Sequence, residues 1–403
     1  MASMGGTGEQ HSGWEIFRIF LRLGLTSFGG PIAHLGYFRT EFVVKRKWLD
    51  EHAYADLVGL CQFLPGPASS QVGFALGLSR RGLAGGLAAW LGFTLPSALL
   101  LFAFATLSAA FTGTAADAAI HGLKIVAVAV VAQALWGMAR SITPDVPRIV
   151  IAVAAALTVS LLAGSFGQIA AIALGAAVGL FLCRGVALPR HESLSFTISR
   201  PMAMAALSSF FFILLAGPLL ALLLHSHTLA VFNAFYRSGA LVFGGGHVVL
   251  PLLSDALVRP GLISPASFLT GYGAAQAVPG PLFTVSAYLG AMLNGPPNGA
   301  AGAAIALAAI FLPGMLILTG TLPFWENLRS RPDLQAAMRG INASVVGILA
   351  AALYTPLWTS AIGGGQDIAL AVAGFVLLTL AKLPSWLIVA GTVAASIALA
   401  AMR

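Results

Sequence analysis

The chain carries very little charge. It has 403 residues, of which 58% are hydrophobic and only 8% are charged, and its mean hydropathy is +0.92. A soluble domain carries roughly a quarter charged residues, so this composition excludes a soluble globular protein. Apolar runs of about 20 residues, long enough to cross a bilayer, recur along nearly the whole chain. The sequence therefore predicts an all-α polytopic membrane protein.

Acidic residues are missing from the centres of the apolar segments. All thirteen Asp and Glu residues lie in the N-terminal tail, in loops or near segment ends. Cation pumps and carboxylate proton relays place acids inside the membrane, so their absence argues against those classes and favours an anion pathway. The chain also lacks His-Glu-x-x-His and an intramembrane carboxylate pair, which a membrane-embedded enzyme would use. An enzyme and a channel remain the alternatives to a transporter.

Cysteine is scarce, and basic residues are confined to loops. The two cysteines, Cys61 and Cys183, are far apart, so they form no metal-binding spacing and we expect neither a metal nor another cofactor. The net charge of +8 arises from short loops, which fits the positive-inside rule and not nucleic-acid binding. Residues 1–13 lack the order of a cleaved signal and are expected to form a flexible tail.

The chain does contain an internal duplication. Residues 22–30 read RLGLTSFGG and residues 237–245 read RSGALVFGG. Each copy is followed by a second shared motif that ends in Pro-Gly-Pro. It reads QFLPGP at residues 62–67 and QAVPGP at residues 276–281. We expect two homologous repeats, 14–185 and 229–403, joined by a linker with one helix at 186–228. A duplication with helix-breaking motifs inside apolar segments is typical of a secondary transporter.

The paired glycines predict broken helices. Gly29 and Gly30 correspond to Gly244 and Gly245, and each glycine in a helix interior costs about 1 kcal/mol relative to alanine. Unwinding would start a new helix, whose free N–H groups and positive dipole suit an anion. Close helix packing through small residues is the alternative explanation.

The Pro-Gly-Pro motifs predict a second pair of breaks. Prolines remove backbone donors and glycine permits a sharp turn. We expect these breaks and the uncharged donors beside them to bind a tetrahedral oxyanion near the membrane midplane, between the repeats. The alternative is that the glutamines only satisfy broken backbone groups. The candidate residues are Gln62, Pro65, Gly66, Pro67 and Ser69, and then Gln276, Pro279, Gly280, Pro281 and Thr284.

Two arginines stand at equivalent positions, six residues before each Phe-Gly-Gly. A charge within a membrane span is costly and usually functional, so Arg22 and Arg237 are candidate counter-charges for an anion. Snorkelling to the interface is the alternative. His34 and His247 follow the glycine pairs, and we interpret them as hydrogen-bonded structural residues, with a proton-carrying role as the alternative.

The loop charges leave the relative orientation of the repeats open. Basic loops flank segment 53–78 on both sides, which favours a segment that dips into the membrane and returns. If only the two Pro-Gly-Pro segments dip, and the others, including 14–36, cross, the repeats come out parallel. If all segments cross, they come out opposite.

Together these motifs resemble the chromate ion transporter family, in its two-domain, long-chain form. The resemblance rests on residues 28–31, 62–67, 243–251 and 276–281 and covers about 14–185 and 229–400. It implies efflux of chromate across the bacterial inner membrane, chromate resistance, and repeats in opposite orientation, with sulfate or another oxyanion as the alternative substrate. The expected partners are such an oxyanion and the lipid bilayer, with a homodimer left open and no nucleic acid.

Overall fold

Helices are the only regular secondary structure in the part of the chain that the computed structural model describes. That part comprises residues 12–108, 113–162, 165–184, 198–325, 328 and 331–402. The expected tail lies outside it except for Ser12 and Gly13, and so do residues 186–197 of the expected linker. The first repeat contains α1 (Gly13–Thr26), α2 (Gly30–Phe38), the π-helical η1 (Arg39–Lys45), α3 (Glu51–Phe63), α4 (Ala68–Ser108), α5 (Thr114–Ile142), α6 (Val146–Leu161) and α7 (Ser165–Leu182).

The linker helix is α8 (Arg200–Leu223). The second repeat repeats the same order of elements. It contains α9 (His227–Ala240), η2 (Gly246–Val248), α10 (Val249–Leu253), η3 (Ser254–Val258), α11 (Pro265–Ala275), η4 (Leu282–Thr284), α12 (Val285–Ala291), α13 (Gly299–Thr321), η5 (Leu322–Phe324), α15 (Pro332–Ala352), η6 (Leu353–Trp358), α16 (Thr359–Ala361), α17 (Gly365–Thr379) and α18 (Ser385–Ala401).

Several helices are long and apolar enough to cross a membrane, which confirms the multi-pass prediction. They cover residues 68–108, 114–142, 200–223, 299–324 and 332–361. The linker helix α8 leaves Phe212, Leu215 and Leu222 between 62% and 72% exposed. A row of large exposed apolar side chains on one helix suits contact with lipid and would be unfavourable in water.

Two segments of the first repeat run into the interior of the molecule and turn back toward the side from which they came. After the break at Gly29 the chain returns along α1, so that the ring of Phe20 lies 5.7 Å from that of Phe38 and 5.0 Å from that of Phe42. The second excursion is α3 and the first part of α4, which ends at non-helical backbone at Arg81 and Gly82. A guanidinium N–H of Arg80 donates to the Trp48 carbonyl at 2.6 Å, so this excursion also ends where it began.

The dip expected for 53–78 is therefore present, whereas the expected crossing at 14–36 is wrong. The physical reason is the left-handed backbone at Gly29 and Gly30, which reverses the chain. Taking this segment out of the count changes the parity of the crossings. The count that had predicted parallel repeats then predicts opposite ones.

Equivalent long helices of the two repeats run antiparallel. We call residues 68–80 of α4 α4a and residues 83–108 α4b; the equivalent of α4b is α13. The Trp90 ring packs edge-on against that of Phe311, with 5.8 Å between ring centroids, while Ala98 lies in one buried cluster with Ala303. Residue numbers rise along one helix as they fall along the other. The repeats are thus inverted, as the family resemblance implied.

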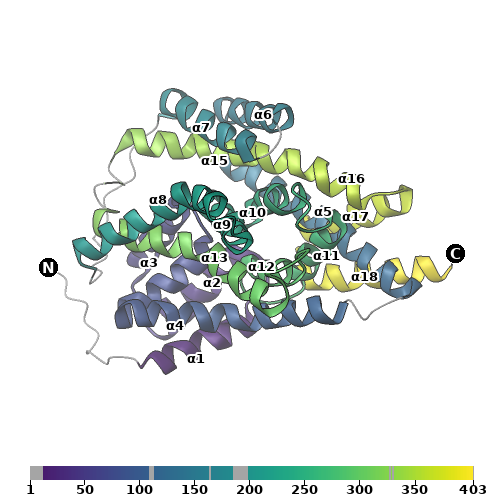
Figure 1. Cartoon of the computed structure of the whole chain (residues 1–403), viewed down its shortest axis with the longest axis horizontal. Coiled ribbons are helices and arrows are strands. Elements are labelled where there is room, and N and C mark those ends of the chain that lie inside the picture. The colour runs from purple at the N-terminus through teal and green to yellow at the C-terminus, as the bar shows by residue number, and fades with distance from the viewer. Residues whose placement is uncertain are drawn as a thin grey trace.

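The last helices of each repeat pack against the other repeat. The α6–α7 hairpin of the first repeat lies on α15 of the second. The α17–α18 pair of the second repeat lies on α5, the helix of the first repeat that is equivalent to α15. Figure 1 shows α6, α7 and α15 together along one long side of the molecule and α1 with α4 along the other.

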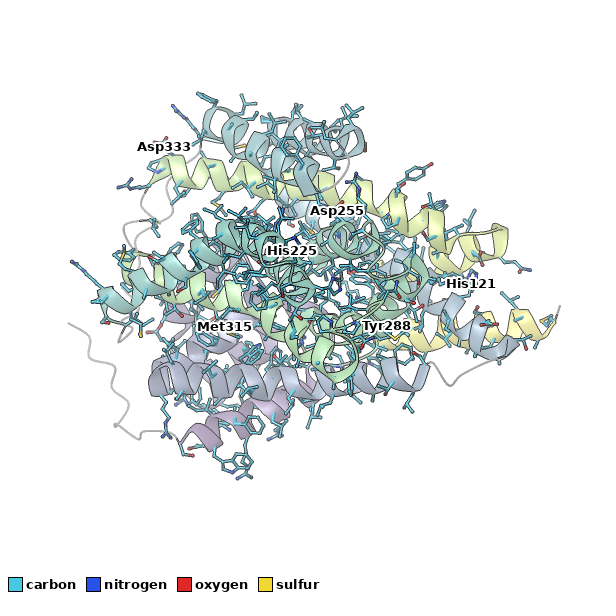
Figure 2. The ribbon with its side chains drawn as sticks, viewed as in Figure 1. His121, His225, Asp255, Tyr288, Met315 and Asp333 are labelled. Atoms are coloured by element: carbon cyan, nitrogen blue, oxygen red, sulfur yellow. The ribbon has the colours of Figure 1, made fainter. Side chains whose placement is uncertain are left out.

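Close backbone contacts and polar bonds hold these exchanged hairpins in place. A Cβ added at Gly340 would lie 2.0 Å from the Gly175 carbonyl oxygen, so only glycine permits this approach. The Ser396 hydroxyl donates to the Ala118 carbonyl at 2.7 Å, and His121 Nε2 lies 2.9 Å from Asp367 Oδ1. Figure 2 places His121 toward the end of the molecule where α17 and α18 lie.

We predict that the two halves fold only together. Expressed as separate chains, 1–190 and 191–403 should copurify when coexpressed, because each half covers apolar faces of the other. Each half expressed alone should be degraded or aggregate. The measurement is membrane abundance and size-exclusion behaviour in detergent. A first half that is abundant and monodisperse by itself would contradict the exchanged packing.

Candidate functional site

Both Phe-Gly-Gly motifs unwind the chain, as the sequence predicted. Helix α1 ends at Thr26 and the backbone then takes positive φ at Gly29 (100°) and Gly30 (77°). In the second repeat Gly244 (72°) and Gly245 (158°) do the same. Side chains rarely tolerate this region, which explains the glycines directly. They do more than let helices pack closely, because they reverse the chain.

The Pro-Gly-Pro motifs meet the breaks of the opposite repeat. Each motif contains a single backbone N–H, because proline has none. Gly66 uses its N–H to donate to the Val242 carbonyl at 2.8 Å, and Gly280 donates to the Ser27 carbonyl at 2.9 Å. Ser27 and Val242 are equivalent residues that stand just before the two Phe-Gly-Gly motifs. The one donor in each motif therefore satisfies a carbonyl outside the helices of the other repeat.

The same pairing brings the motifs against the prolines of the long helices. A Cβ on Gly66 would lie 3.0 Å from Gly314 Cα, and one on Gly280 would lie 2.8 Å from Ser97 Oγ. Gly314 and Ser97 are equivalent and directly follow the prolines inside α13 and α4b. Pro31 contacts Gly246, its own counterpart. The internal two-fold axis thus passes between Pro31 and Gly246, and we call this meeting point of the four motifs the junction.

Buried polar side chains of the first repeat surround the junction. Ser69 lies in the first turn of α4, where its hydroxyl is 3.4 Å from His34 Nδ1. The Gln71 amide nitrogen donates to the Pro65 carbonyl at 2.9 Å and to the Gly314 carbonyl at 3.0 Å. Ser27 and His34 are fully buried. Ser27 escaped the sequence reasoning; the available signal was a polar residue beside a helix break, where its counterpart is valine.

The two predicted glutamines do not occupy equivalent environments. Gln276 is buried, and its side-chain amide nitrogen is 3.5 Å from the Tyr272 carbonyl. The main-chain carbonyl of Gln276 accepts from the Ser385 hydroxyl at 3.0 Å. Gln62 is exposed on α3. The predicted hydroxyl donor Thr284 turns back on its own motif, donating to the Pro281 carbonyl at 2.6 Å. Gln276 thus satisfies local backbone, which is the alternative stated for the glutamines, and Thr284 does the same.

The two predicted arginines also lie in different environments. Arg237 lines a cavity of about 580 Å³ with Asn233, Asp255 and Arg259, where α8, α9 and η3 meet. It also lines a smaller cavity that reaches Leu241, at the second break. This placement suits an entry path for an anion.

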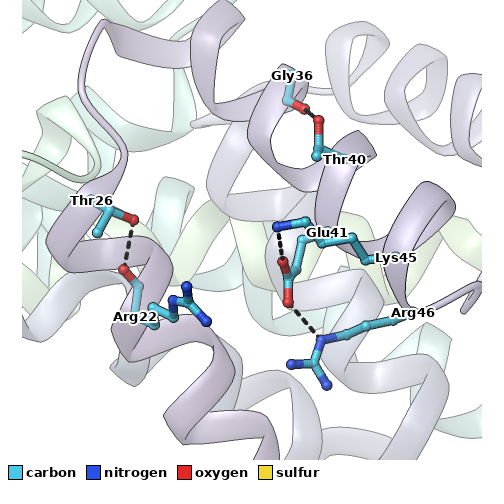
Figure 3. Close-up of polar contacts among 7 residues, drawn as sticks. All are labelled: Arg22, Thr26, Gly36, Thr40, Glu41, Lys45 and Arg46. Atoms are coloured by element: carbon cyan, nitrogen blue, oxygen red, sulfur yellow. Dashed lines mark hydrogen bonds and ion pairs between the residues drawn. The ribbon is translucent and has the colours of Figure 1, made fainter.

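Arg22 instead lies on the exposed face of α1, where Thr26 donates to its carbonyl at 2.8 Å. Figure 3 shows it beside Thr26, and shows Glu41 binding Lys45 and Arg46 on the neighbouring segment. The structure does not bring Arg22 to the junction, and the snorkelling interpretation fits it better. Among the described residues no group of three or more His, Cys, Asp or Glu side chains is placed to hold a metal ion.

We predict that Gly66→Ala destabilises the protein by about 1–3 kcal/mol, because φ is 122° there and the new Cβ would meet Gly314. The measurement is the unfolding midpoint of purified protein in detergent. Gly59→Ala is the matched control, since it lies in the adjoining helix α3 with no atom within 4 Å of an added Cβ. Equal midpoints for the two variants would contradict the junction's role in stability.

Comparison with known proteins agrees with this architecture. The family model described as "Chromate transporter" matches residues 14–180 and again 229–397, once in each repeat. A chromate transport protein of Pseudomonas aeruginosa is 29% identical over 347 residues, which are 84% of this chain and 79% of that protein. A chromate transport protein of Cupriavidus metallidurans is 26% identical over 382 residues, 94% of this chain and 90% of its own length.

A shorter relative matches less than half of this chain. An uncharacterized transporter of Bacillus subtilis is 31% identical over 171 residues, which are 40% of this chain but 90% of that protein. No solved structure matches the chain. Because the family model matches both repeats over most of the sequence, the chain belongs to the chromate transporter family.

Proposed function

We propose that the protein is a secondary transporter that exports chromate across the bacterial inner membrane and so confers chromate resistance. The observation that carries this proposal is the junction. Two broken helices from inverted repeats meet two Pro-Gly-Pro turns in the interior of a chromate transporter family member. Broken helices at the interface of inverted repeats are where secondary transporters bind their substrates.

The proposed energy source is the membrane potential or an ion gradient. The sequence has no nucleotide-binding motif, and an inside-negative potential favours expulsion of an anion by about 2.3 kcal/mol per charge per 100 mV. A dianion such as chromate experiences this twice. Transport then requires the repeats to exchange conformations around the junction, with the cavity at Arg237 serving as the access path on one side.

Sulfate is the second candidate substrate. It has the shape and charge of chromate, so neutral hydrogen-bond donors alone separate the two ions poorly. The junction offers glycine N–H groups, hydroxyls and helix ends, none of which distinguishes chromium from sulfur at the centre of the ion. The same donors would serve either ion, and flux measurements must distinguish them.

We predict saturable, potential-driven chromate flux by the purified protein in liposomes. A potassium–valinomycin potential should drive radiolabelled chromate toward the positive side without ATP, and internal unlabelled chromate should accelerate label entry by counterflow. Saturation and counterflow argue against a channel. Flux of sulfate alone would replace the substrate, and flux of neither above empty liposomes would overturn the proposal.

We predict unequal effects of the two equivalent arginines. Arg237→Gln should raise the KM for chromate about tenfold, since it removes positive charge from the large cavity and from the smaller one that reaches Leu241; this corresponds to about 1.4 kcal/mol. Arg22→Gln should leave KM within about twofold, because Arg22 lies on the exposed face of α1. The measurement is initial flux against chromate concentration. Equal effects would show that the repeat symmetry, and not the cavity, decides the role of these residues.

A further inference from the structure

The backbone of the junction is symmetric, but its side chains are not. Four polar residues of the first repeat, on α2, on α4 and in the first break, have apolar counterparts in the second. The pairs, first repeat before second, are Ser27 and Val242, His34 and Val249, Ser69 and Phe283, and Thr94 and Phe311. A purely structural need for polar groups at these depths would apply to both repeats, since both have the same breaks. The polarity of the first repeat therefore requires another reason.

Three of these residues carry a buried polar atom without a partner, and so does Ser70, whose counterpart Thr284 is also polar but is hydrogen-bonded. Ser27 Oγ, His34 Nε2, Ser70 Oγ and Thr94 Oγ1 have essentially no solvent contact and no hydrogen bond. Their residues are between 0% and 5% exposed. Buried polar groups in folded proteins are nearly always paired, because leaving one unpaired destabilises the folded state. Four such atoms in one repeat therefore lower the stability of the folded protein at this place.

Two polar groups at this depth in the second repeat do have hydrogen-bond partners. The Ser286 hydroxyl donates to the Phe283 carbonyl at 2.8 Å, and His247 Nδ1 lies 2.7 Å from the Tyr272 hydroxyl. Close to the second break, the unpartnered atom is the amide oxygen of Asn342, which is an acceptor. Among the described residues close to the two breaks, the unused donors thus lie in the first repeat, and donors are what an anion needs.

The unused donors converge on two helix starts. Helix α2 begins at Gly30, directly after the break, and carries His34, which faces the backbone of Ser27. Helix α4 begins at Ala68, directly after Pro-Gly-Pro, and Ser69 and Ser70 lie in its first turn. His34 also packs edge-on against Phe93, the neighbour of Thr94, at 5.2 Å between rings. Positive helix ends and hydroxyl groups together favour an oxyanion over a cation or a neutral ligand.

We propose that Ser27, His34, Ser69 and Ser70 form an oxyanion-binding site that belongs to the first repeat alone, with the second repeat supplying its apolar wall. This deepens the proposed function and rests on it. In the site, the Ser27 and Ser70 hydroxyls and the His34 Nε2–H donate to the oxygens of a tetrahedral dianion, while the Ser69 hydroxyl donates to His34 Nδ1 and so selects that tautomer. Because these residues are sealed from solvent in this structure, an ion reaches them only when the junction opens, as alternating access requires.

The test separates binding from stability. Full-length protein in lipid nanodiscs is titrated calorimetrically with sulfate and with chromate, and its melting temperature is measured without either ion. Ser27→Ala and His34→Leu should each raise the dissociation constant at least tenfold. The melting temperature of Ser27→Ala should stay equal to that of wild type or rise, since this variant removes an unpaired buried polar atom. That of His34→Leu should fall less than in the paired controls, since this variant removes the unpaired Nε2 together with only the long 3.4 Å contact from Nδ1 to Ser69. A residue that merely supported the fold would show the opposite stability change.

Matched controls come from the second repeat. Ser286→Ala and His247→Gln remove a buried and a half-buried group that already have partners, so they should lower the melting temperature and leave the dissociation constant within about twofold. His34→Gln, which keeps an N–H donor, should recover part of the affinity that His34→Leu loses.

The outcomes distinguish the two proposals. Wild type that binds and transports an oxyanion, with Ser27→Ala and His34→Leu binding it equally well, overturns the first-repeat site and leaves the transport function standing. Wild type that neither binds nor transports chromate or sulfate overturns both. Loss of affinity with the melting temperature lowered to the same degree as in the controls also overturns the site, because it assigns these residues to the fold.

Discussion

The structure depends on two backbone hydrogen bonds that cross between the repeats. Inside a membrane protein a carbonyl outside a helix must find a donor within the protein, because lipid offers none. Gly66 and Gly280 supply that donor to Val242 and Ser27, and they are the only N–H groups their motifs possess. Each repeat therefore supplies a hydrogen bond to the broken helix of the other.

The remaining packing reinforces this exchange. The equivalent helices α4b and α13 cross antiparallel beside the junction, and the hairpins α6–α7 and α17–α18 lie on the long helices of the opposite repeat. A movement of one repeat relative to the other must pass through the junction. An oxyanion bound there would be sensitive to that movement, which links the inverted fold to transport by a member of the chromate transporter family.

Symmetry of the backbone and asymmetry of the side chains have different physical origins. The breaks need glycine and proline in both repeats, because both must reverse the chain at membrane depth. The proposed oxyanion site, by contrast, would need only one set of donors, which fits the apolar Val242, Val249 and Phe311 at the same positions of the second repeat. The pairing of Arg237 with a cavity, while Arg22 lies on an exposed face, follows the same division.

The sequence by itself determined the fold class, the duplication and the places where helices break, because these follow from local properties: apolar length, the positive φ of Gly29 and Gly66, and the missing N–H of proline. Only the tertiary structure decided that segment 14–36 turns back, that the repeats are inverted, and that Gln276 is buried while Gln62 is exposed. Those outcomes depend on which distant backbone group satisfies each break. That partner lies more than 170 residues away and comes from the other repeat, so no local pattern could name it.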